Sequence, residues 1–170
     1  MSMSNVNKYQ AIVGIDPDTV KSGCAYLETG TRIIEASSLA FPQLLDYLKF
    51  IAEKSKESAQ TVIVVVESGW KLQSNWHTTH KDTIRTAVAK GNAVGRNHEI
   101  GRKIVECARH YGLEVIEQIP LKKCWKGRDG KITQKELAYF TGTTGTQSQD
   151  VRDAVLLAWH YAGFPIKMKV

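Results

Sequence analysis

Apolar residues recur along the chain in two distinct periods. Unbroken or alternating apolar runs predict strands over residues 10–16, 22–28, 32–39, 61–66 and 113–119. Apolar residues at helical spacing predict helices over residues 41–57, 92–111, 133–140 and 148–161. The order β-β-β-α-β-α-β-α-α is typical of an α/β protein with a mixed five-stranded sheet, in which the run 61–66 is a central strand covered on both faces.

The chain shows no internal repeat and no linker. Its 170 residues, 42% of them hydrophobic, suffice for one compact core, so we expect a single domain over residues 1–170. The stretch 68–89 shows the least regular pattern, and we expect a functional loop there. This loop contains Trp76, His77 and His80, but two histidines without a third ligand do not predict a metal site.

Two of the predicted strands end in a lone carboxylate, which a buried apolar strand does not need for stability. Asp16 ends the first strand and Glu67 ends the run of valines, while Asp150 and Asp153 are three residues apart on the last helix and therefore share a face. Four convergent carboxylates, with no histidine or cysteine at matching spacing, favour a hard divalent ion such as Mg²⁺ or Mn²⁺.

Charge adds a second element to this picture. Lysine and arginine number 23 against 17 acids, which gives a net charge of +6 and a pI of about 9.2. This balance favours a polyanionic partner over a soluble protein that is basic by chance. Five cations gather in the segment 122–131: Lys122, Lys123, Lys126, Arg128 and Lys131.

The remaining composition indicates the compartment. Cys24, Cys107 and Cys124 show no C-x-x-C spacing, so we expect them to be buried, reduced and apolar in a cytoplasmic protein. No apolar run reaches membrane-spanning length, and the amino terminus has no apolar stretch typical of a signal peptide. Trp125 and Trp159 are expected in the core.

Several short motifs occur in the order found in a known family. The segments are Gly14-Ile15-Asp16-Pro17, Val66-Glu67, Gly91-Asn92-Ala93-Val94-Gly95, Pro120-Leu121-Lys122-Lys123 and Asp150-Val151-Arg152-Asp153-Ala154. Together, from about residue 11 to 163, they resemble the RuvC family of Holliday junction resolvases, which have an RNase H-like fold. Asp18 replaces a glycine of the family motif, and we expect it to act as a turn residue rather than as a fifth metal ligand.

The resemblance implies a magnesium-dependent crossover junction endodeoxyribonuclease that acts in DNA recombination and repair. It implies two Mg²⁺ ions per subunit, for which Mn²⁺ can substitute, with Asp16 bridging them and Glu67 and Asp153 each completing one site. Asp150 would bind one ion or support a ligand, and Lys123 would contact the scissile phosphate. The catalytic residues are then Asp16, Glu67, Lys123, Asp150 and Asp153.

The family likeness also predicts partners. Trp70 either stacks at the centre of a four-way junction or packs over the sheet edge. We expect a homodimer through the helix 92–111, with Gly91, Gly95 and Gly101 allowing close approach. Branch-migration or host recombination proteins are further partners of such an activity. The predicted DNA contacts are Trp70, Lys71, Lys81, Arg85, Lys122, Lys123, Lys126, Arg128 and Lys131.

Other functions remain open at this point. Another RNase H-like nuclease, acting on RNA–DNA hybrids or other branched DNA, has the same set of acids. A nuclease-dead DNA-binding module is disfavoured because all four acids are present. Actin-like or sugar-kinase-like ATPases also begin with a strand that ends in aspartate, but they need a second lobe for which 170 residues leave no room.

Overall fold

The fold is built on a mixed sheet of five strands, seen in a computed structural model that describes residues 8–72 and 79–168. The order across the sheet is β3-β2-β1-β4-β5. The first three strands are antiparallel, and β4 and β5 run parallel to β1, which confirms the predicted sheet. Their bounds are β1 Ala11–Asp16, β2 Ser22–Glu28, β3 Ile34–Leu39, β4 Val62–Glu67 and β5 Glu114–Gln118.

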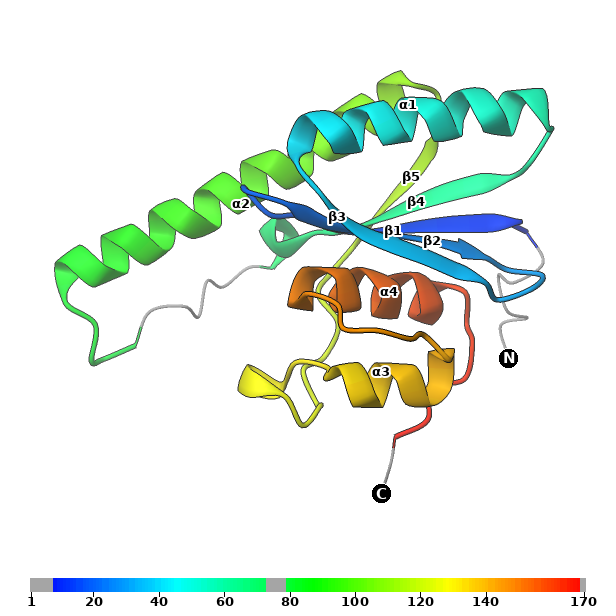
Figure 1. Ribbon diagram of the computed structural model, residues 1–170. Coiled ribbons are helices and arrows are strands. Elements are labelled where there is room, and N and C mark those ends of the chain that lie inside the picture. Colours follow the sequence, from blue (N-terminus) through cyan, green and yellow to red (C-terminus); the bar gives the residue numbers. More distant parts are fainter. Residues whose placement is uncertain (1–7, 73–78, 169–170) are drawn as a thin grey trace.

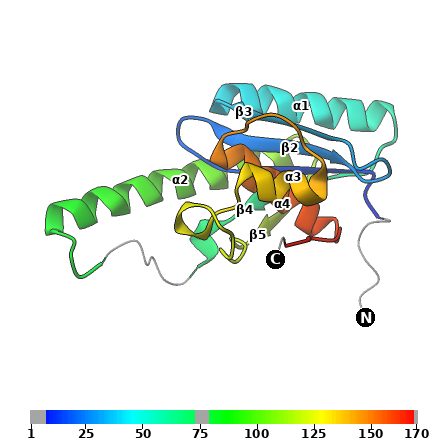
Figure 2. The same cartoon turned by 60° about the horizontal axis from the view of Figure 1, so that its bottom comes forward.

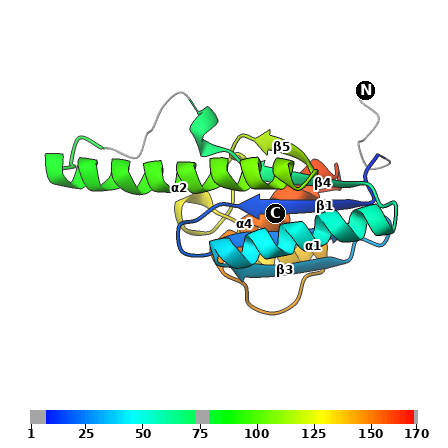
Figure 3. The same cartoon turned by 90° about the horizontal axis from the view of Figure 1, so that it is seen from above.

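Helices cover both faces of this sheet. Helices α1 (Phe41–Glu57) and α2 (Ile84–His110) lie on one face, and α2 extends well past the edge of the sheet (Figures 1 and 3). Helix α4 (Gln149–Tyr161) covers the other face, with α3 (Gln134–Thr141) outside it (Figure 2). Short 3₁₀ turns lie at Gly69–Lys71 (η2) and Arg128–Gly130 (η3). None of the helices in the described ranges is both long and apolar enough to cross a membrane.

The start of α2 corrects one prediction. The helix begins at Ile84 rather than at residue 92, so the second half of the expected loop 68–89 is helical, and η2 occupies part of the first half. The Thr83 side chain caps the helix by accepting the Thr86 N–H, and Lys90 pairs with Asp82 at 2.8 Å. Ile84 and Val88 share one face of this overhanging part and are both exposed, so the apolar pattern that marks it as a helix is short. Trp76 and His77 lie outside the described residues.

Alternation along the central strands divides the core into layers. In β4, Val62, Val64 and Val66 face α1 and α2, whereas Ile63 and Val65 face α4. The expectation for the cysteines was partly wrong, because Cys24 is buried but Cys107 is half-buried and Cys124 is exposed. Cys124 lies between β5 and η3, in a short run of exposed residues that includes Lys122 and Lys123.

The two tryptophans expected in the core belong to the layer around α4. Trp159 is buried there. Trp125 is half-buried and stacks on Phe140, at 5.9 Å between ring centroids. The prediction is thus confirmed for Trp159, while Trp125 packs at the margin of the core.

Close packing fixes where α4 begins. A Cβ atom on Gly23 of β2 would lie 1.9 Å from the backbone oxygen of Asp150, so only glycine lets the helix approach the strand this closely. The Ser148 side chain caps the same helix by accepting the Val151 N–H. The first turn of α4 is therefore held beside the end of β1 that carries Asp16.

Candidate active site

Adjacent parallel strands bring the first two carboxylates together. β1 and β4 are in register through Ile15 and Val66, so the next residues, Asp16 and Glu67, leave the sheet side by side. Both acids line one pocket of about 100 Å³, which Asp153 of α4 also lines. The structure therefore brings together three of the four predicted acids at one pocket.

Asp150 lies at the margin of this group. It belongs to the first turn of α4, one turn before Asp153, and its side chain is about half-buried. Burial raises the pKa of Asp150, and the charge of Asp18 raises it further. Asp150 is thus close enough to the other acids for its charge to act on them, although it does not line the pocket.

Mutual repulsion shows in the titration of the two strand acids. Burial raises the pKa of Asp16 well above its usual range, and the charges of Glu67, Asp153 and Asp150 raise it further. Burial and the Asp153 charge raise the pKa of Glu67 from 4.5 to about 7, against the opposing effect of Lys131 and Lys123. The cluster as it stands therefore lacks positive charge.

Lys131 supplies part of that charge. Its Nζ lies 3.4 Å from Oδ2 of Asp153, while Nε2 of Gln149 donates a hydrogen bond of 2.8 Å to Oδ1 of the same carboxylate. Burial lowers the pKa of Lys131, but the charges of Asp153, Asp16 and Asp150 outweigh it and leave the pKa raised. Both oxygens of Asp153 are therefore engaged by groups of the protein itself.

The donor set fits a hard divalent ion in its chemistry. In residues 8–72 and 79–168, no three His, Cys, Asp or Glu side chains lie close enough together to hold an ion as they stand. The acids at the site nevertheless offer oxygen ligands alone, which is what Mg²⁺ and Mn²⁺ prefer, and their raised pKa values indicate an unmet need for positive charge. A cation bound by Asp153 would replace the Lys131 ammonium as its partner.

Asp18 takes the turn role. Its Oδ1 accepts the N–H groups of Val20 at 2.8 Å and Lys21 at 3.3 Å, which closes a turn directly after Asp16 and Pro17. The N–H of Thr19 in the same turn donates to Oδ1 of Asn97 on α2 at 3.2 Å. The Asp18 side chain thus stabilises the turn that follows β1.

The basic segment 122–131 divides into a near and a far group. Lys122, Lys123 and Lys131 line the pocket with Asp16 and Glu67. The backbone folds back on itself through bonds from Trp125 N–H to Gly130 C=O and from Gly127 N–H to Lys131 C=O, both of 3.0 Å. Arg128 projects into solvent beyond this turn, next to Asp129. The near group is therefore placed to meet a phosphate at the pocket, and the far group to meet the backbone of a longer ligand.

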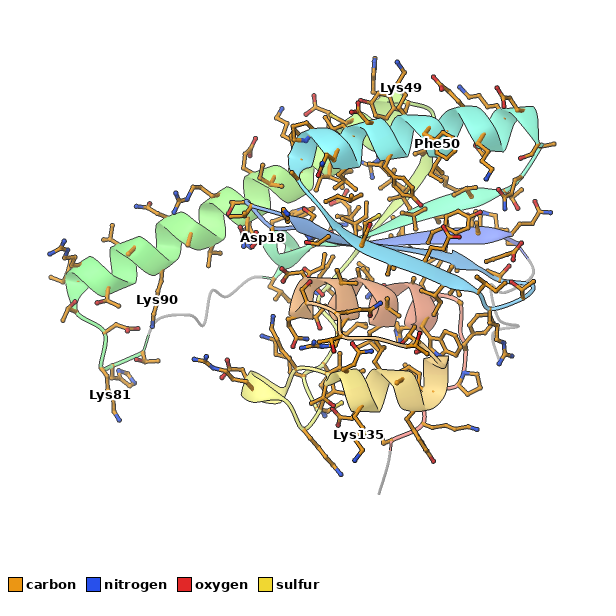
Figure 4. The ribbon with its side chains drawn as sticks, viewed as in Figure 1. Asp18, Lys49, Phe50, Lys81, Lys90 and Lys135 are labelled. Carbon is orange, nitrogen blue, oxygen red and sulfur yellow. The ribbon has the colours of Figure 1, made fainter. Side chains whose placement is uncertain are left out.

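Lys71, Lys81 and Arg85 do not reach this pocket. Nζ of Lys71 lies 3.6 Å from Oε2 of Glu117, on the side facing α2. Lys81 lies at the far end of α2 from the sheet, as Figure 4 shows, and Arg85 is in the first turn of that helix. Their predicted DNA contacts require a ligand that extends along α2.

Trp70 packs within the protein. Its indole N–H donates a hydrogen bond of 3.1 Å to Oε2 of Glu117, and its half-buried ring contacts α2 at Gly101. The space left by Gly101 is thus filled by this chain's own ring. Gly91 and Gly95 border open space, because no other side chain or element in the described part of the chain comes within 4 Å of where a Cβ atom would stand.

The sequence did not predict that one face of α2 lines a groove beside the acids. A groove of about 330 Å³ continues from Asp16 and Glu67 past Val94, Asn97 and His98. These residues share a helical stripe with the buried Gly101, whereas the predicted stripe began at Ala93, which is exposed. Val94, Asn97, His98 and Gly101 have the i, i+3, i+4, i+7 spacing of one helix face. Hydrophobic periodicity does not detect this face because Asn97 and His98 are polar.

Comparisons with known proteins agree with this architecture. The sequence matches no protein-family model and no curated protein. Among solved structures, the chain is similar to T. thermophilus RuvC in complex with a Holliday junction substrate, with a TM-score of 0.50 and 13% sequence identity. The match covers 88% of this chain and 90% of that chain. The protein therefore has the α/β fold of RuvC and other RNase H-like proteins.

Proposed function

We propose that this protein is a metal-dependent endonuclease that cuts four-way DNA junctions symmetrically. The observation that carries the proposal is the pocket where Asp16, Glu67 and Asp153 meet Lys123 and Lys131. Acids there can hold cations and orient a water, and the lysines can neutralise a phosphate, which is the combination that phosphodiester hydrolysis needs. The fold is shared with a RuvC seen on a Holliday junction, which favours this substrate.

Each side chain has a defined part in this proposal. Asp16, Glu67, Asp150 and Asp153 would hold Mg²⁺, which supplies positive charge for the phosphate and lowers the pKa of water. Lys123, which lines the same pocket, contacts the scissile phosphate. A cation held by Asp153 would take the place of Lys131 as its partner, which would leave the Lys131 ammonium for the DNA backbone. Lys122, Lys126 and Arg128 extend the same positive strip outward.

Two-fold symmetry of the substrate calls for two copies of the site. A four-way junction presents two equivalent strands, so an isologous dimer would place one pocket at each. The overhanging part of α2 offers a surface for this: Ile84 is 87% and Val88 56% exposed, and Gly91 and Gly95 leave space beside them. Apolar residues exposed on a helix that projects from the fold favour burial against a second copy.

One assay tests the proposal. The purified protein is incubated with Mg²⁺ and an end-labelled mobile four-way junction, alongside duplex, nicked, flap and RNA–DNA hybrid controls. Paired symmetric nicks confined to the junction are expected. Cleavage of the hybrid instead of the junction would indicate a different RNase H-like nuclease, one that acts on RNA–DNA hybrids. Junction binding without any cleavage, in Mg²⁺ and in Mn²⁺, would leave a DNA-binding module.

A further inference from the structure

The segment that follows Glu67 is fastened to the neighbouring strand by two consecutive residues of β5. The N–H of Ser68 donates a hydrogen bond of 2.7 Å to the carbonyl of Gln118, which is paired with Glu67 in the sheet register. The next residue back, Glu117, accepts the indole N–H of Trp70 at 3.1 Å. The segment after β4 is thus bonded to β5 through the backbone of Ser68 and through the side chain of Trp70.

Glu117 accepts two hydrogen bonds and forms an ion pair with a third side chain. Besides Trp70, Nη2 of Arg109 donates to its Oε1 at 3.1 Å, and Nζ of Lys71 lies 3.6 Å from its Oε2. The carboxylate side chain is only 16% exposed. A carboxylate enclosed this far is stable because its lone pairs are satisfied, so the removal of any donor has a cost at this point.

Helix α2 packs against the half-buried ring of Trp70, which also lines the groove beside Asp16 and Glu67. A Cβ atom on Gly101 would lie 2.2 Å from Cζ3 of Trp70 and 3.3 Å from Cγ of Pro17, so the ring and the proline meet at the same notch in the helix. The imidazole of His98 meets the indole edge-on, with centroids 6.3 Å apart, and the Arg102 guanidinium lies 5.9 Å from the ring centroid.

This notch relates the two catalytic strands to one helix. Pro17 directly follows Asp16, and Trp70 is three residues after Glu67. The packing of Pro17 and Trp70 against Gly101 therefore helps to fix where Asp16 and Glu67 lie in the pocket. A side chain with its polar atom bonded and its ring in a notch of the helix is a poor candidate for stacking on a DNA base, because stacking would require it to leave both partners.

We propose that Trp70, Glu117 and Gly101 form a latch that positions Glu67, and that Trp70 acts through this latch rather than by stacking on DNA. The inference rests on the proposed nuclease function for its catalytic consequence, but the latch itself is a property of the folded chain. Misplacement of a catalytic group by about 1 Å can cost on the order of a hundredfold in rate. Trp70 also lines the groove that runs from Asp16 and Glu67. We class the three as positioning residues because the indole N–H is bonded to Glu117 and the ring fills the notch at Gly101.

Fluorine NMR tests the latch without any reaction. The four tryptophans are labelled as 5-fluorotryptophan, and the Trp70 resonance is assigned by its loss in Trp70→Phe. Glu117→Gln and Gly101→Ala are expected to move this resonance in the DNA-free protein. Gly30→Ala, in the turn between β2 and β3, is the matched control, because an added methyl group there would enter open space, and it is expected to leave the resonance in place.

The same label decides between the latch and base stacking. With Ca²⁺ in place of Mg²⁺, the junction is expected to bind without being cut, and the Trp70 resonance is expected to stay where it is in the free protein. A shift on junction binding as large as the one caused by Glu117→Gln would overturn the proposal and return Trp70 to the DNA. An unchanged resonance in both Glu117→Gln and Gly101→Ala would equally overturn it.

Cleavage kinetics test the positioning role. Glu117→Ala and Gly101→Ala are expected to lower kcat by about tenfold or more with KM within about twofold, because the fault lies in orientation rather than in binding. Trp70→Phe keeps an aromatic ring but loses the N–H and part of the indole, so its effect and that of Glu117→Gln should not add fully in the double variant. Glu114→Gln, on the opposite face of the same strand and bonded to Tyr9, is the control and should cleave normally.

Failure of the latch and failure of the nuclease function give different results. A wild-type protein that cuts none of the DNA substrates would end the proposed function, while the fluorine resonance would still report the latch. Normal kcat in Glu117→Ala, with the Trp70 resonance shifted, would show that the latch exists but does not position Glu67, and would overturn the inference.

Discussion

Nζ of Lys131 lies 3.4 Å from Oδ2 of Asp153, so a lysine from a loop partly neutralises a carboxylate from the second turn of α4. The two strand acids beside this pair keep raised pKa values in spite of it. One ammonium is therefore not enough for the cluster, and the remaining repulsion is a cost of folding the metal-free protein at neutral pH.

Glu67→Gln is expected to stabilise the metal-free protein at about pH 8 and to have little effect at about pH 4. The pKa of Glu67 is about 7 in the folded protein against an ordinary 4.5. Between these values the folded state binds more protons than the unfolded chain, so the free energy of unfolding falls as the pH rises. The full pKa shift corresponds to a loss of about 3 kcal/mol in the free energy of unfolding once Glu67 is ionised. The glutamine variant avoids this loss because glutamine cannot ionise.

Calorimetry in EDTA at several pH values measures this effect as a difference in Tm. Glu106→Gln is the matched control, because Glu106 is an exposed acid that pairs with Lys103 on α2, away from the pocket. A Glu67→Gln stabilisation of the same size at pH 4 and pH 8 would contradict the argument. Addition of Mg²⁺ should raise the Tm of the wild type more than that of Glu67→Gln.

Asp16→Asn is expected to abolish cleavage and to leave junction binding intact or tighter. The substitution keeps the shape of the side chain while it removes one ligand charge and its repulsion of phosphate. Rates are measured on a labelled junction at saturating Mg²⁺, and binding by gel shift in Ca²⁺. Activity above about a tenth of the wild-type rate would be incompatible with a metal-bridging role for Asp16.

Lys123→Ala is expected to lower the cleavage rate and to flatten the salt dependence of junction binding. Each phosphate contact contributes about 0.9 to the slope of log K against log salt on duplex DNA, so the loss of one contact should reduce the slope by about that amount. Lys49→Ala, on α1 at the opposite face of the sheet from α3 and α4, serves as the control (Figure 4). Identical slopes for both variants would show that Lys123 is a solvated surface lysine without a phosphate contact.

Val88→Asp is expected to convert a dimer of twice 19.0 kDa into a monomer, because it places an unpaired charge in the proposed interface. Phe50→Asp on α1 is the control, since Phe50 is exposed to a similar extent, 53% against 56%. Sedimentation velocity measures both. A wild-type protein that sediments as a monomer and still makes paired nicks would refute the symmetric arrangement.

Much of the fold was predictable because its strands are buried on a regular period. The valine run ending in Glu67 and the i, i+3 pair Asp150 and Asp153 identified both the sheet and the acids at its edge. The part of α2 before residue 92 was missed because its large apolar residues are only Ile84 and Val88, which share one face four residues apart and are both exposed. Gly101 predicted that another group packs closely against α2, but the sequence does not show that this group is the Trp70 ring.

The role of Glu117 was beyond sequence reasoning for a similar cause. It is one of several acids in a strand with mixed exposure, and its partners Trp70 and Arg109 lie on two other elements. Contacts of this kind depend on how a helix crosses a sheet, which hydrophobic periodicity does not report. The strongest sequence signals therefore came from residues that break a pattern, as Asp16 and Glu67 do.

The central position of β1 and β4 has a consequence for how the pocket moves. Each of these strands is hydrogen-bonded to a neighbouring strand on both sides. Asp16 and Glu67 therefore belong to the most stable part of the fold, and their backbone amides should exchange with solvent only on global unfolding. Lys123 and Lys131 belong to a loop joined by a few turn bonds, whose amides should exchange by local opening. The pocket thus combines a rigid acidic wall with an adaptable basic wall, and a bent or distorted DNA strand would be accommodated by the second while the first keeps its geometry.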